Sequence, residues 1–321
     1  MRSLLLPCTP VFACLRVRPG LGSRIRVNSL YHYRHSGLLV SSELELPEWQ
    51  SFSCPPGEAD VSIILSDEPC PDFPADASLV EGNSLSFLIE GIGGWCIEDG
   101  SRITLFHLSG VAPSELRLFT LGSAWAALGY QRGFAMWHGS VVERGGVAVL
   151  FCGDAGAGKS TMAALLCAQG AKLIADDLSR VEPGKCCAFI HPSSTRIKLW
   201  QPAIEHLGWQ DRVIQRDFFR EDKFHCALPD HAGGGDPQRL DAIIILEEAD
   251  IPSLEPLSGA SALKAVLQGT LYRPEMLEAM GQWGKQAALA AAIVANTQVY
   301  RLKRPKRFGD TERDRLLRDL I

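Results

Sequence analysis

The stretch Val147-Ala-Val-Leu-Phe-Cys-Gly-Asp-Ala-Gly-Ala-Gly-Lys-Ser160 decides the fold of this 321-residue chain. Its second half fits G-x-x-x-x-G-K-[ST], a glycine loop that cradles phosphate groups when it joins a strand to a helix. The apolar run Val147–Cys152 before the loop is typical of a buried strand. Residues 160–169 after the loop, followed by Gly170, predict a helix with a glycine stop.

This loop supplies the groups that a bound nucleotide needs. Its glycines let the backbone approach phosphate oxygens without Cβ clashes, and its amides and the helix N-terminus attract an anion. The Lys159 ammonium would meet the β- and γ-phosphates, and the Ser160 hydroxyl would bind Mg²⁺. We predict that ATP and Mg²⁺ bind here, with contacts from Gly153, Asp154, Ala155, Gly156, Ala157, Gly158, Lys159, Ser160 and Thr161. The alternative is a glycine-rich turn without a ligand, which the strand and helix context disfavours.

Composition narrows the class of protein. A hydrophobic content of 46% and a charged content of 21% are those of an ordinary globular chain. The net charge of −5 disfavours nucleic acid as a partner. No run reaches the roughly eighteen apolar residues that span a bilayer, so no membrane partner is expected. The ten cysteines include no C-x-x-C pair and indicate reduced thiols in a cytoplasmic protein.

The chain divides into three parts by pattern. Residues 1–42 hold six arginines and no acidic residue, and prolines break up any apolar run, so we predict a disordered extension or a misplaced start over residues 1–29. Residues 30–130 predict a small β-rich domain with a linking helix, including a hairpin at Asp99-Gly100 and an amphipathic face at Leu118, Leu121, Trp125 and Leu128. Strands and helices alternate over residues 131–321, which predicts an α/β nucleotide-binding domain.

The run Leu173-Ile-Ala-Asp-Asp177 carries the second set of chemical groups. It would form the strand after the loop helix, and a crossover in a parallel sheet brings the C-terminal ends of both strands to one edge. Asp176 and Asp177 would therefore end their strand beside the phosphates. One would bind Mg²⁺ and the other would accept the proton of an acceptor hydroxyl. We expect Ser160 and Asp177 to hold the metal, although the sequence leaves the division of roles open; the alternative is a helix N-cap.

Three motifs together resemble the kinase domain of HPr kinase/phosphorylase. They are Trp137-His-Gly-Ser-Val-Val142, the loop Gly153 to Ser160, and Ala175-Asp-Asp177. The whole chain is most similar to the HPr-kinase-related kinases of bacterial peptide-modification clusters, which include kinases of lasso-peptide precursors. This second resemblance also uses a helix that ends near Gln131-Arg132-Gly133 and a closing strand Tyr300-Arg-Leu302.

The resemblance implies an α/β P-loop kinase domain of the HPr kinase type and an ATP-dependent serine kinase. It implies that His138, Lys159, Asp176 and Asp177 are catalytic, and that the partner is a peptide or small protein with an acceptor serine. The downstream glycine-rich signature of the bifunctional enzymes is missing, so the resemblance supports only the kinase half-reaction. A nucleotidyl transferase, an ATP-gated peptide-binding module and a homo-oligomer stay open.

Basic side chains downstream are secondary candidates. Arg196 and Lys198 alternate on a predicted strand, so both face one side, toward either substrate or nucleotide. Lys223 lies in a charged segment and is expected to be a solvated lysine, with closure on the γ-phosphate as the alternative. Arg132 favours a salt bridge, and the basic run from Arg301 to Arg307 favours a solvated face.

Overall fold

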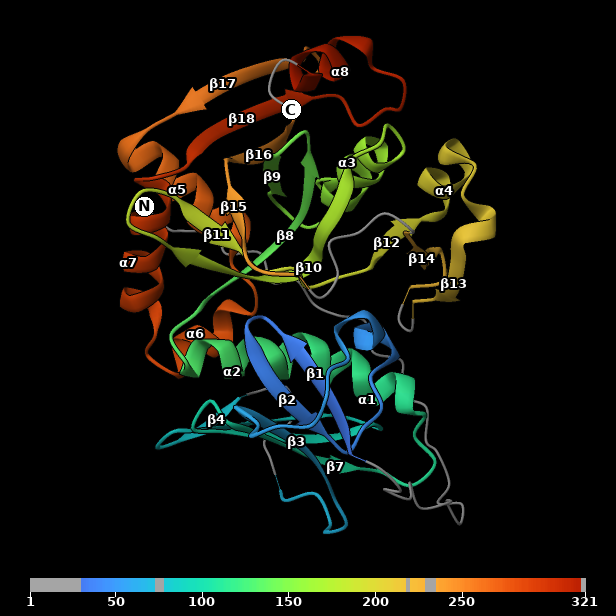
Figure 1. Ribbon diagram of the computed structural model, residues 1–321, viewed down its shortest axis with the longest axis vertical. Coiled ribbons are helices and arrows are strands. Elements are labelled where there is room, and N and C mark those ends of the chain that lie inside the picture. The colour runs from blue at the N-terminus through green and yellow to red at the C-terminus, as the bar shows by residue number, and fades with distance from the viewer. Residues whose placement is uncertain (1–29, 73–77, 218–219, 229–234, 319–321) are drawn as a thin grey trace, which may run out of the picture.

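The fold is mixed α/β in the computed structural model of the chain, which describes residues 30–72, 78–217, 220–228 and 235–318. Within these residues the strands form three sheets, and the first of them lies apart from the other two in Figure 1. Residues 1–29, where the sequence predicts an extension, lie outside the described part. In the described residues, no helix is both long and apolar enough to cross a membrane.

The first sheet is built by the N-terminal residues and has the order β1-β2-β3-β7-β6-β5-β4. Strands β6 and β7 form the predicted antiparallel hairpin, in which Asp99 and Gly100 have φ of 50° and 62°. Two consecutive residues with positive φ make the turn type that matches the twist of a hairpin. The strands are β1 Tyr31–His35, β2 Leu38–Ser42, β3 Val61–Ser66, β4 Leu79–Glu81, β5 Ser84–Ile89, β6 Gly93–Glu98 and β7 Arg102–His107, with a 3₁₀ turn at Pro47–Phe52.

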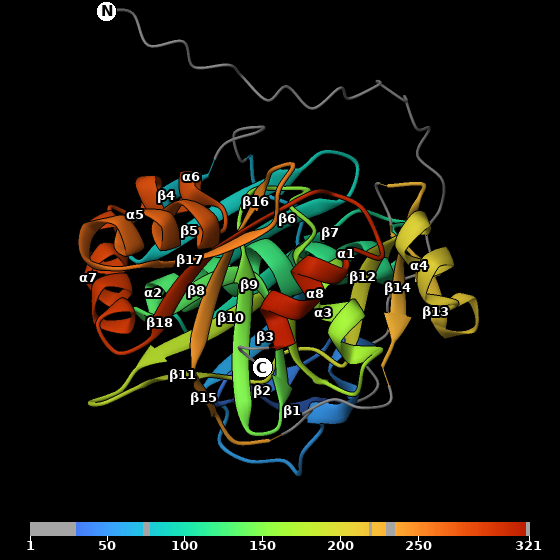
Figure 2. The same ribbon diagram turned by 90° about the horizontal axis from the view of Figure 1, so that it is seen from above.

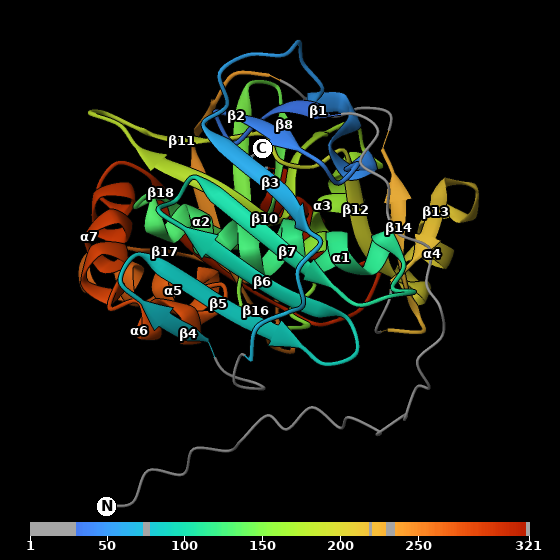
Figure 3. The ribbon, with the colours of Figure 1, turned by 90° about the horizontal axis from the view of Figure 1, so that it is seen from below.

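The predicted amphipathic helix covers this sheet. It comprises α1 Pro113–Phe119, a π-helical turn Thr120–Ala124 and α2 Trp125–Gln131. Figure 1 shows it between the N-terminal sheet and the rest of the molecule, and Figure 3 shows the sheet laid across it. Trp125 is 3% exposed, and the Trp95 indole donates to Thr120 Oγ1 at 3.0 Å. The apolar face of the helix is therefore buried as its spacing predicts.

The central sheet has the order β15-β11-β10-β8-β9-β16-β18-β17 and corrects the expectation of a parallel sheet. Only β9, β16 and β18 run parallel, whereas β8 is antiparallel to both β9 and β10. The short connection through Gly145 and Gly146, with φ of 61° and 87°, permits only a hairpin, because a parallel pair needs a long crossover. The strands are β8 Ala135–Arg144, β9 Val147–Cys152, β10 Lys172–Pro183, β11 Ala188–Ile190, β15 Gln238–Leu240, β16 Ala242–Glu248, β17 Ser253–Leu257 and β18 Gln298–Arg304.

Strand β10 is longer than the sequence predicts, which moves the two aspartates. Asp176 and Asp177 do not end a strand; they lie inside β10, opposite Ser140 and Gly139 of β8. The reason is that β8 continues the ladder past them as far as the pair Val181 and Ala135. No helix begins at the pair, so the helix-cap alternative is wrong.

A third, smaller sheet and several helices complete the C-terminal part. The sheet has the order β12-β14-β13, with β12 Arg196–Trp200, β13 Val213–Arg216 and β14 Lys223–Ala227. Figure 2 shows this sheet and α4 on one side of the molecule, with α5, α6 and α7 on the other. The helices are α3 Lys159–Cys167, α4 Gln201–Leu207, α5 Gly259–Thr270, α6 Pro274–Ala279, α7 Trp283–Val294 and α8 Thr311–Arg318, with a 3₁₀ turn at Gln210–Arg212.

Two polar side chains tie the N-terminal sheet to the C-terminal part. His35, at the β1–β2 turn, stacks on Trp49 with ring centres 3.9 Å apart, and its Nε2 lies 3.2 Å from the carbonyl oxygen of Ser193. Glu48 is within ion-pair distance of Arg117, at 2.9 Å, and of Arg196 on β12, at 3.6 Å. The N-terminal part of the chain is thus linked, through Glu48 of the 3₁₀ turn, to the strand that also carries Lys198.

We expect His35 to make the folded protein sensitive to acid. Burial lowers the pKa of His35 from 6.5 to about 3, so the folded state excludes a proton that the unfolded chain binds. The stabilisation that neutral His35 gives the folded state is complete above about pH 6.5. It is lost as the pH falls toward the pKa of His35 in the folded protein. Each unit by which the pKa of His35 differs between the folded and unfolded states corresponds to about 1.4 kcal/mol of unfolding free energy. The free energy of unfolding in urea should therefore fall between about pH 7 and about pH 5.

The control variant is His35→Gln, whose amide can donate to Ser193 but does not titrate. It should be less stable than the wild type at neutral pH but lose less stability on acidification. Equal pH slopes for the two proteins would show that His35 is not the group responsible.

Candidate functional site

The loop of residues 153–160, which we call the phosphate loop after its predicted role, has the backbone geometry that its glycines predict. Gly153, Gly156 and Gly158 have φ of 135°, 79° and 88°, in a region that other residues rarely adopt. Gly158 forms the N-cap of α3. Lys159 is 8% exposed, and its ammonium donates to the carbonyl oxygens of Gly153 and Asp154, both at 3.0 Å. Burial lowers the pKa of Lys159, with nearby acidic groups opposing.

Arg304 at the end of β18 supports the loop and is 6% exposed, which corrects the expectation that this part of the basic run is a solvated face. Its guanidinium donates to the carbonyl oxygens of Ala157 and Pro305. The Ala157 carbonyl and the Gly158 amide belong to one trans peptide and point in opposite directions. The arginine therefore fixes the direction of a loop N–H, and it sits where a Cβ on Gly158 would come within 2.6 Å of it.

Asp176 lies at the centre of a buried hydroxyl cluster. Its Oδ1 accepts from Ser140 Oγ at 2.6 Å and from Ser160 Oγ at 2.9 Å. Its Oδ2 accepts from the backbone N–H of Lys198 at 2.9 Å. Burial raises the pKa of this carboxyl, although the hydrogen bonds from Ser140 and Lys198 oppose the shift. Asp176, and not Asp177, is the aspartate that contacts the hydroxyl of the loop serine.

Asp177 faces a different set of partners. Its Oδ2 accepts from Lys198 Nζ at 2.6 Å, and its Oδ1 lies 3.5 Å from His138 Nε2. Burial alone would raise its pKa, but Lys198 and His138 hold the pKa well below the usual range, so the carboxylate is ionised. Its φ of 76° inside a strand is unfavourable for a residue with a Cβ, and such backbone conformations concentrate at functional sites.

His138 of β8 is a neutral partner of this carboxylate. Burial lowers its pKa to about 4, and the Asp177 charge only partly opposes the shift. The edge of its ring meets the Tyr272 ring, with centres 5.7 Å apart. Tyr272 is held in turn by the hydroxyl of Tyr130, which donates to its carbonyl oxygen at 2.6 Å. Tyr272 and Ser140 are site residues that the sequence did not predict, because their roles depend on distant contacts.

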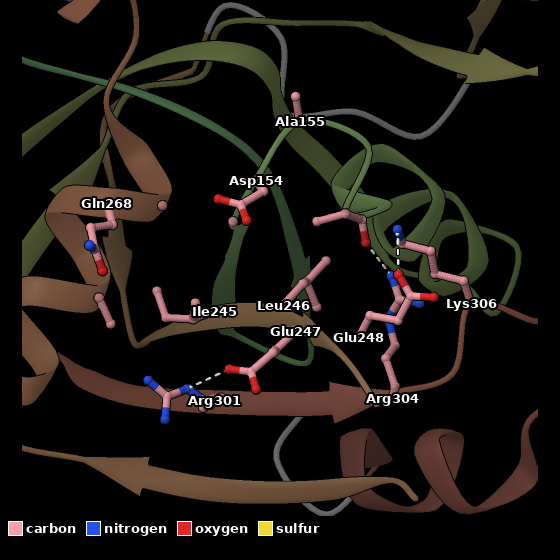
Figure 4. A pocket seen from close by; sticks show the side chains of 14 residues that line it. Asp154, Ala155, Ile245, Leu246, Glu247, Glu248, Gln268, Arg301, Arg304 and Lys306 are labelled. Carbon is pink, nitrogen blue, oxygen red and sulfur yellow. Dashed lines mark hydrogen bonds and ion pairs between the residues drawn. The ribbon is translucent and has the colours of Figure 1, made fainter. Parts of the chain in front are cut away.

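A cavity of about 360 Å³ adjoins the phosphate loop on the side of β16 and β18 (Figure 4). Asp154 and Gln268 lie at its edge in Figure 4. Arg301 and Glu247, which also line the cavity, form an ion pair at 3.1 Å. Its lining does not include the two aspartates of β10. Its remaining lining residues are Gly153, Ala155, Ala157, Ile245, Leu246, Glu248, Ala265, Gly269, Arg304 and Lys306.

The donors around Ser160 fit a magnesium ion. Mg²⁺ prefers oxygen ligands and is usually held by one or two carboxylates, with phosphates and water filling the other positions. The Ser160 hydroxyl and the Asp176 carboxylate supply such oxygens 2.9 Å apart. In the described residues, no group of three or more His, Cys, Asp or Glu side chains is arranged to hold a metal. Ser160 contacts Asp176 and not Asp177, the aspartate expected to hold the metal with it, because Asp177 Oδ2 accepts from Lys198 Nζ at 2.6 Å.

The structure thus brings the predicted catalytic residues His138, Lys159, Asp176 and Asp177 into one site. Lys198, one of the secondary candidates, joins them as the ion-pair partner of Asp177, at 2.6 Å. Arg196, the other secondary candidate on β12, instead forms an ion pair with Glu48 of the N-terminal part at 3.6 Å, which indicates a structural role. Arg132 contacts the Gly100 carbonyl at 2.7 Å instead of the site.

Comparisons with known proteins find distant structural similarity to a solved kinase/phosphatase. No family model matches the chain, and no curated protein matches it in sequence. Among solved structures, the chain is similar to the Hpr(Ser) kinase/phosphatase from Coxiella burnetii, with 12% sequence identity and a TM-score of 0.31. The match covers 57% of this chain and 88% of that protein. A similarity of this size carries no weight for function, and the proposals below rest on the geometry of the site.

Proposed function

We propose that this protein is an ATP- and Mg²⁺-dependent kinase that transfers the γ-phosphoryl group to a serine hydroxyl of a peptide or small protein. The observation that carries the proposal is the position of two aspartates beside one phosphate loop. Asp176 contacts the loop serine, and Asp177 is one residue further along, ionised and partly exposed at 35% of its side chain. Phosphoryl transfer needs both a metal ligand and a carboxylate that orients the acceptor.

The loop and Asp176 form the nucleotide half of this site. The loop amides and Lys159 would hold the β- and γ-phosphates, since they combine backbone donors with a fixed positive charge. Ser160 and Asp176 would hold the metal ion, which neutralises charge that develops on the transferred group. The cavity beside the loop, with its charged wall, is the place we assign to the nucleoside.

Asp177 and its partners form the acceptor half. Asp177 is the more exposed of the two carboxylates, so an incoming hydroxyl can reach it, whereas Asp176 is 7% exposed and accepts three hydrogen bonds. A carboxylate with a low pKa is a weak base. It suits a loose transition state, in which orienting the hydroxyl matters more than early removal of its proton. Neutral His138 would keep the carboxylate in position.

The direct test is transfer of label from γ-³²P-ATP to serine-containing peptides in the presence of Mg²⁺. Lasso-peptide precursors are the acceptors we would include first. Mass spectrometry should find a single phosphate on serine. An added nucleotide would indicate a nucleotidyl transferase instead. ATP binding without any product on a broad peptide panel would indicate a binding module and contradict the proposal.

A further inference from the structure

A group of three side chains next to Asp177 plays no part in the proposed reaction. Trp200 at the end of β12, Lys223 at the start of β14 and Arg220 before it form what we call the basic corner. Trp200 and Lys223 are opposite each other in the β12–β14 pair, with Lys223 Nζ 5.7 Å from the centre of the indole ring. Arg220 Cζ lies 5.9 Å from the same ring. Trp200 is 44% exposed, so the basic corner is open to solvent.

The basic corner borders the acceptor side of the site. Trp200 is two residues beyond Lys198 on β12, so both side chains project from the same face of the strand, roughly 7 Å apart along it. Lys198 is the residue that holds Asp177, at 2.6 Å. Lys223 also lies close enough to Asp177 for that carboxylate to raise its pKa, against the larger effects of burial and Arg220. An acceptor that reaches Asp177 would therefore pass the basic corner.

The two positive charges of the basic corner lie close together. Lys223 Nζ and Arg220 Cζ lie 5.7 Å and 5.9 Å from the centre of the same indole ring, and the Arg220 charge adds to burial in lowering the pKa of Lys223. In the described residues, no carboxylate lies within ion-pair distance of Arg220 or Lys223. Two like charges beside one exposed indole repel each other, and an anion bound between them would relieve that repulsion. The indole adds a flat surface on which a chain can pack.

We propose that the basic corner binds an acidic side chain of the acceptor polypeptide, close to the serine that receives the phosphate. The inference rests on the proposed function, because that function places the acceptor hydroxyl at Asp177. The phosphates of the nucleotide are already served by Lys159 and the loop amides, none of which belongs to β12 or β14. The substrate class is therefore a polypeptide with aspartate or glutamate beside the acceptor serine.

The test compares short fluorescein-labelled peptides that contain one serine flanked by aspartate, asparagine or lysine. The wild-type protein should favour the aspartate peptide over the asparagine peptide by about fivefold in kcat/KM and in binding, as expected for a partly exposed ion pair. The preference should shrink as salt is added. Arg220→Gln should remove most of it, and Arg220→Glu should shift it toward the lysine peptide. Trp200→Ala should weaken the binding of all three peptides.

The matched control is Arg216→Gln, which removes one exposed positive charge from β13 of the same small sheet and should leave the preference unchanged. Equal kcat/KM for the aspartate and asparagine peptides, or an equal loss in the Arg216 and Arg220 variants, would overturn the inference. Fluorescence anisotropy reads peptide binding without transfer, and so separates this inference from the proposed function. Binding of the aspartate peptide through Arg220 without phosphate transfer would contradict the kinase proposal alone. Transfer without preference would contradict the basic corner alone, and neither binding nor transfer would contradict both.

Discussion

Lys159→Ala should abolish measurable phosphoryl transfer while the protein stays folded. The lysine is the one side-chain cation of the phosphate loop, and its ammonium lies 3.0 Å from two loop carbonyl oxygens. Removing a preorganised charge from a site where negative charge develops costs on the order of 10³-fold in rate. Because the hydrogen bonds of this ammonium to the described residues lie within the loop, the melting temperature should change by no more than about 4 °C.

Transfer and thermal unfolding should be measured on the same preparations, with Lys172→Ala as the control. Lys172 is an exposed lysine at the start of β10, so its loss removes the same charge away from the loop. Its activity should equal that of the wild type. Near-normal turnover by Lys159→Ala would contradict the assignment of the loop to phosphate binding.

Asp177→Asn should slow transfer by roughly 10²- to 10⁴-fold, the usual range for loss of a carboxylate that handles the acceptor proton. ATP affinity should change little, because Asp177 contacts Lys198 and His138 and not the loop. Asp176→Asn should behave differently. It removes a carboxylate that accepts from Ser160 at 2.9 Å, so it should weaken the Mg²⁺ dependence of ATP binding as well as the rate.

Calorimetry of ATP binding with and without Mg²⁺ separates the two variants, and labelled transfer gives the rates. Asp250→Asn, an exposed aspartate after β16, is the control and should match the wild type. If Asp177→Asn phosphorylates peptide at the normal rate, the proposed acceptor half of the site is wrong. If the two variants have the same Mg²⁺ dependence, the division of roles between the aspartates is wrong.

Local pattern was enough to predict the elements that carry the loop. The strand Val147–Cys152 has the predicted bounds, and the helix after it begins at Lys159, because an apolar run and a glycine loop are signals within a few residues. The direction of neighbouring strands was predicted wrongly. Alternating strands and helices suggested a parallel sheet, but the Gly145-Gly146 turn makes β8 and β9 a hairpin, and this decides where β10 lies.

The partners within the site could not be predicted from spacing. Arg304 reaches Ala157 across 147 positions of sequence, and Tyr130 reaches Tyr272 across 142. The choice of Asp176 for the loop serine follows from strand register, since Asp176 is opposite Ser140 while Asp177 has φ of 76° and turns to Lys198. A shift of one residue in register would exchange such neighbours, and the sequence alone does not fix register to that accuracy.

The contacts of His35 and Glu48 bear on how this chain could be divided or recombined. A cut at residue 131 would separate His35 from Ser193 and Glu48 from Arg196, and it would leave Leu178, Met276 and Leu277 without the N-terminal apolar cluster in which they are buried. Exposed apolar side chains of this kind promote aggregation of a fragment. The part of the chain after residue 131 is therefore a poor donor for gene fusions or domain exchange, and the two halves are expected to be inherited together as one unit.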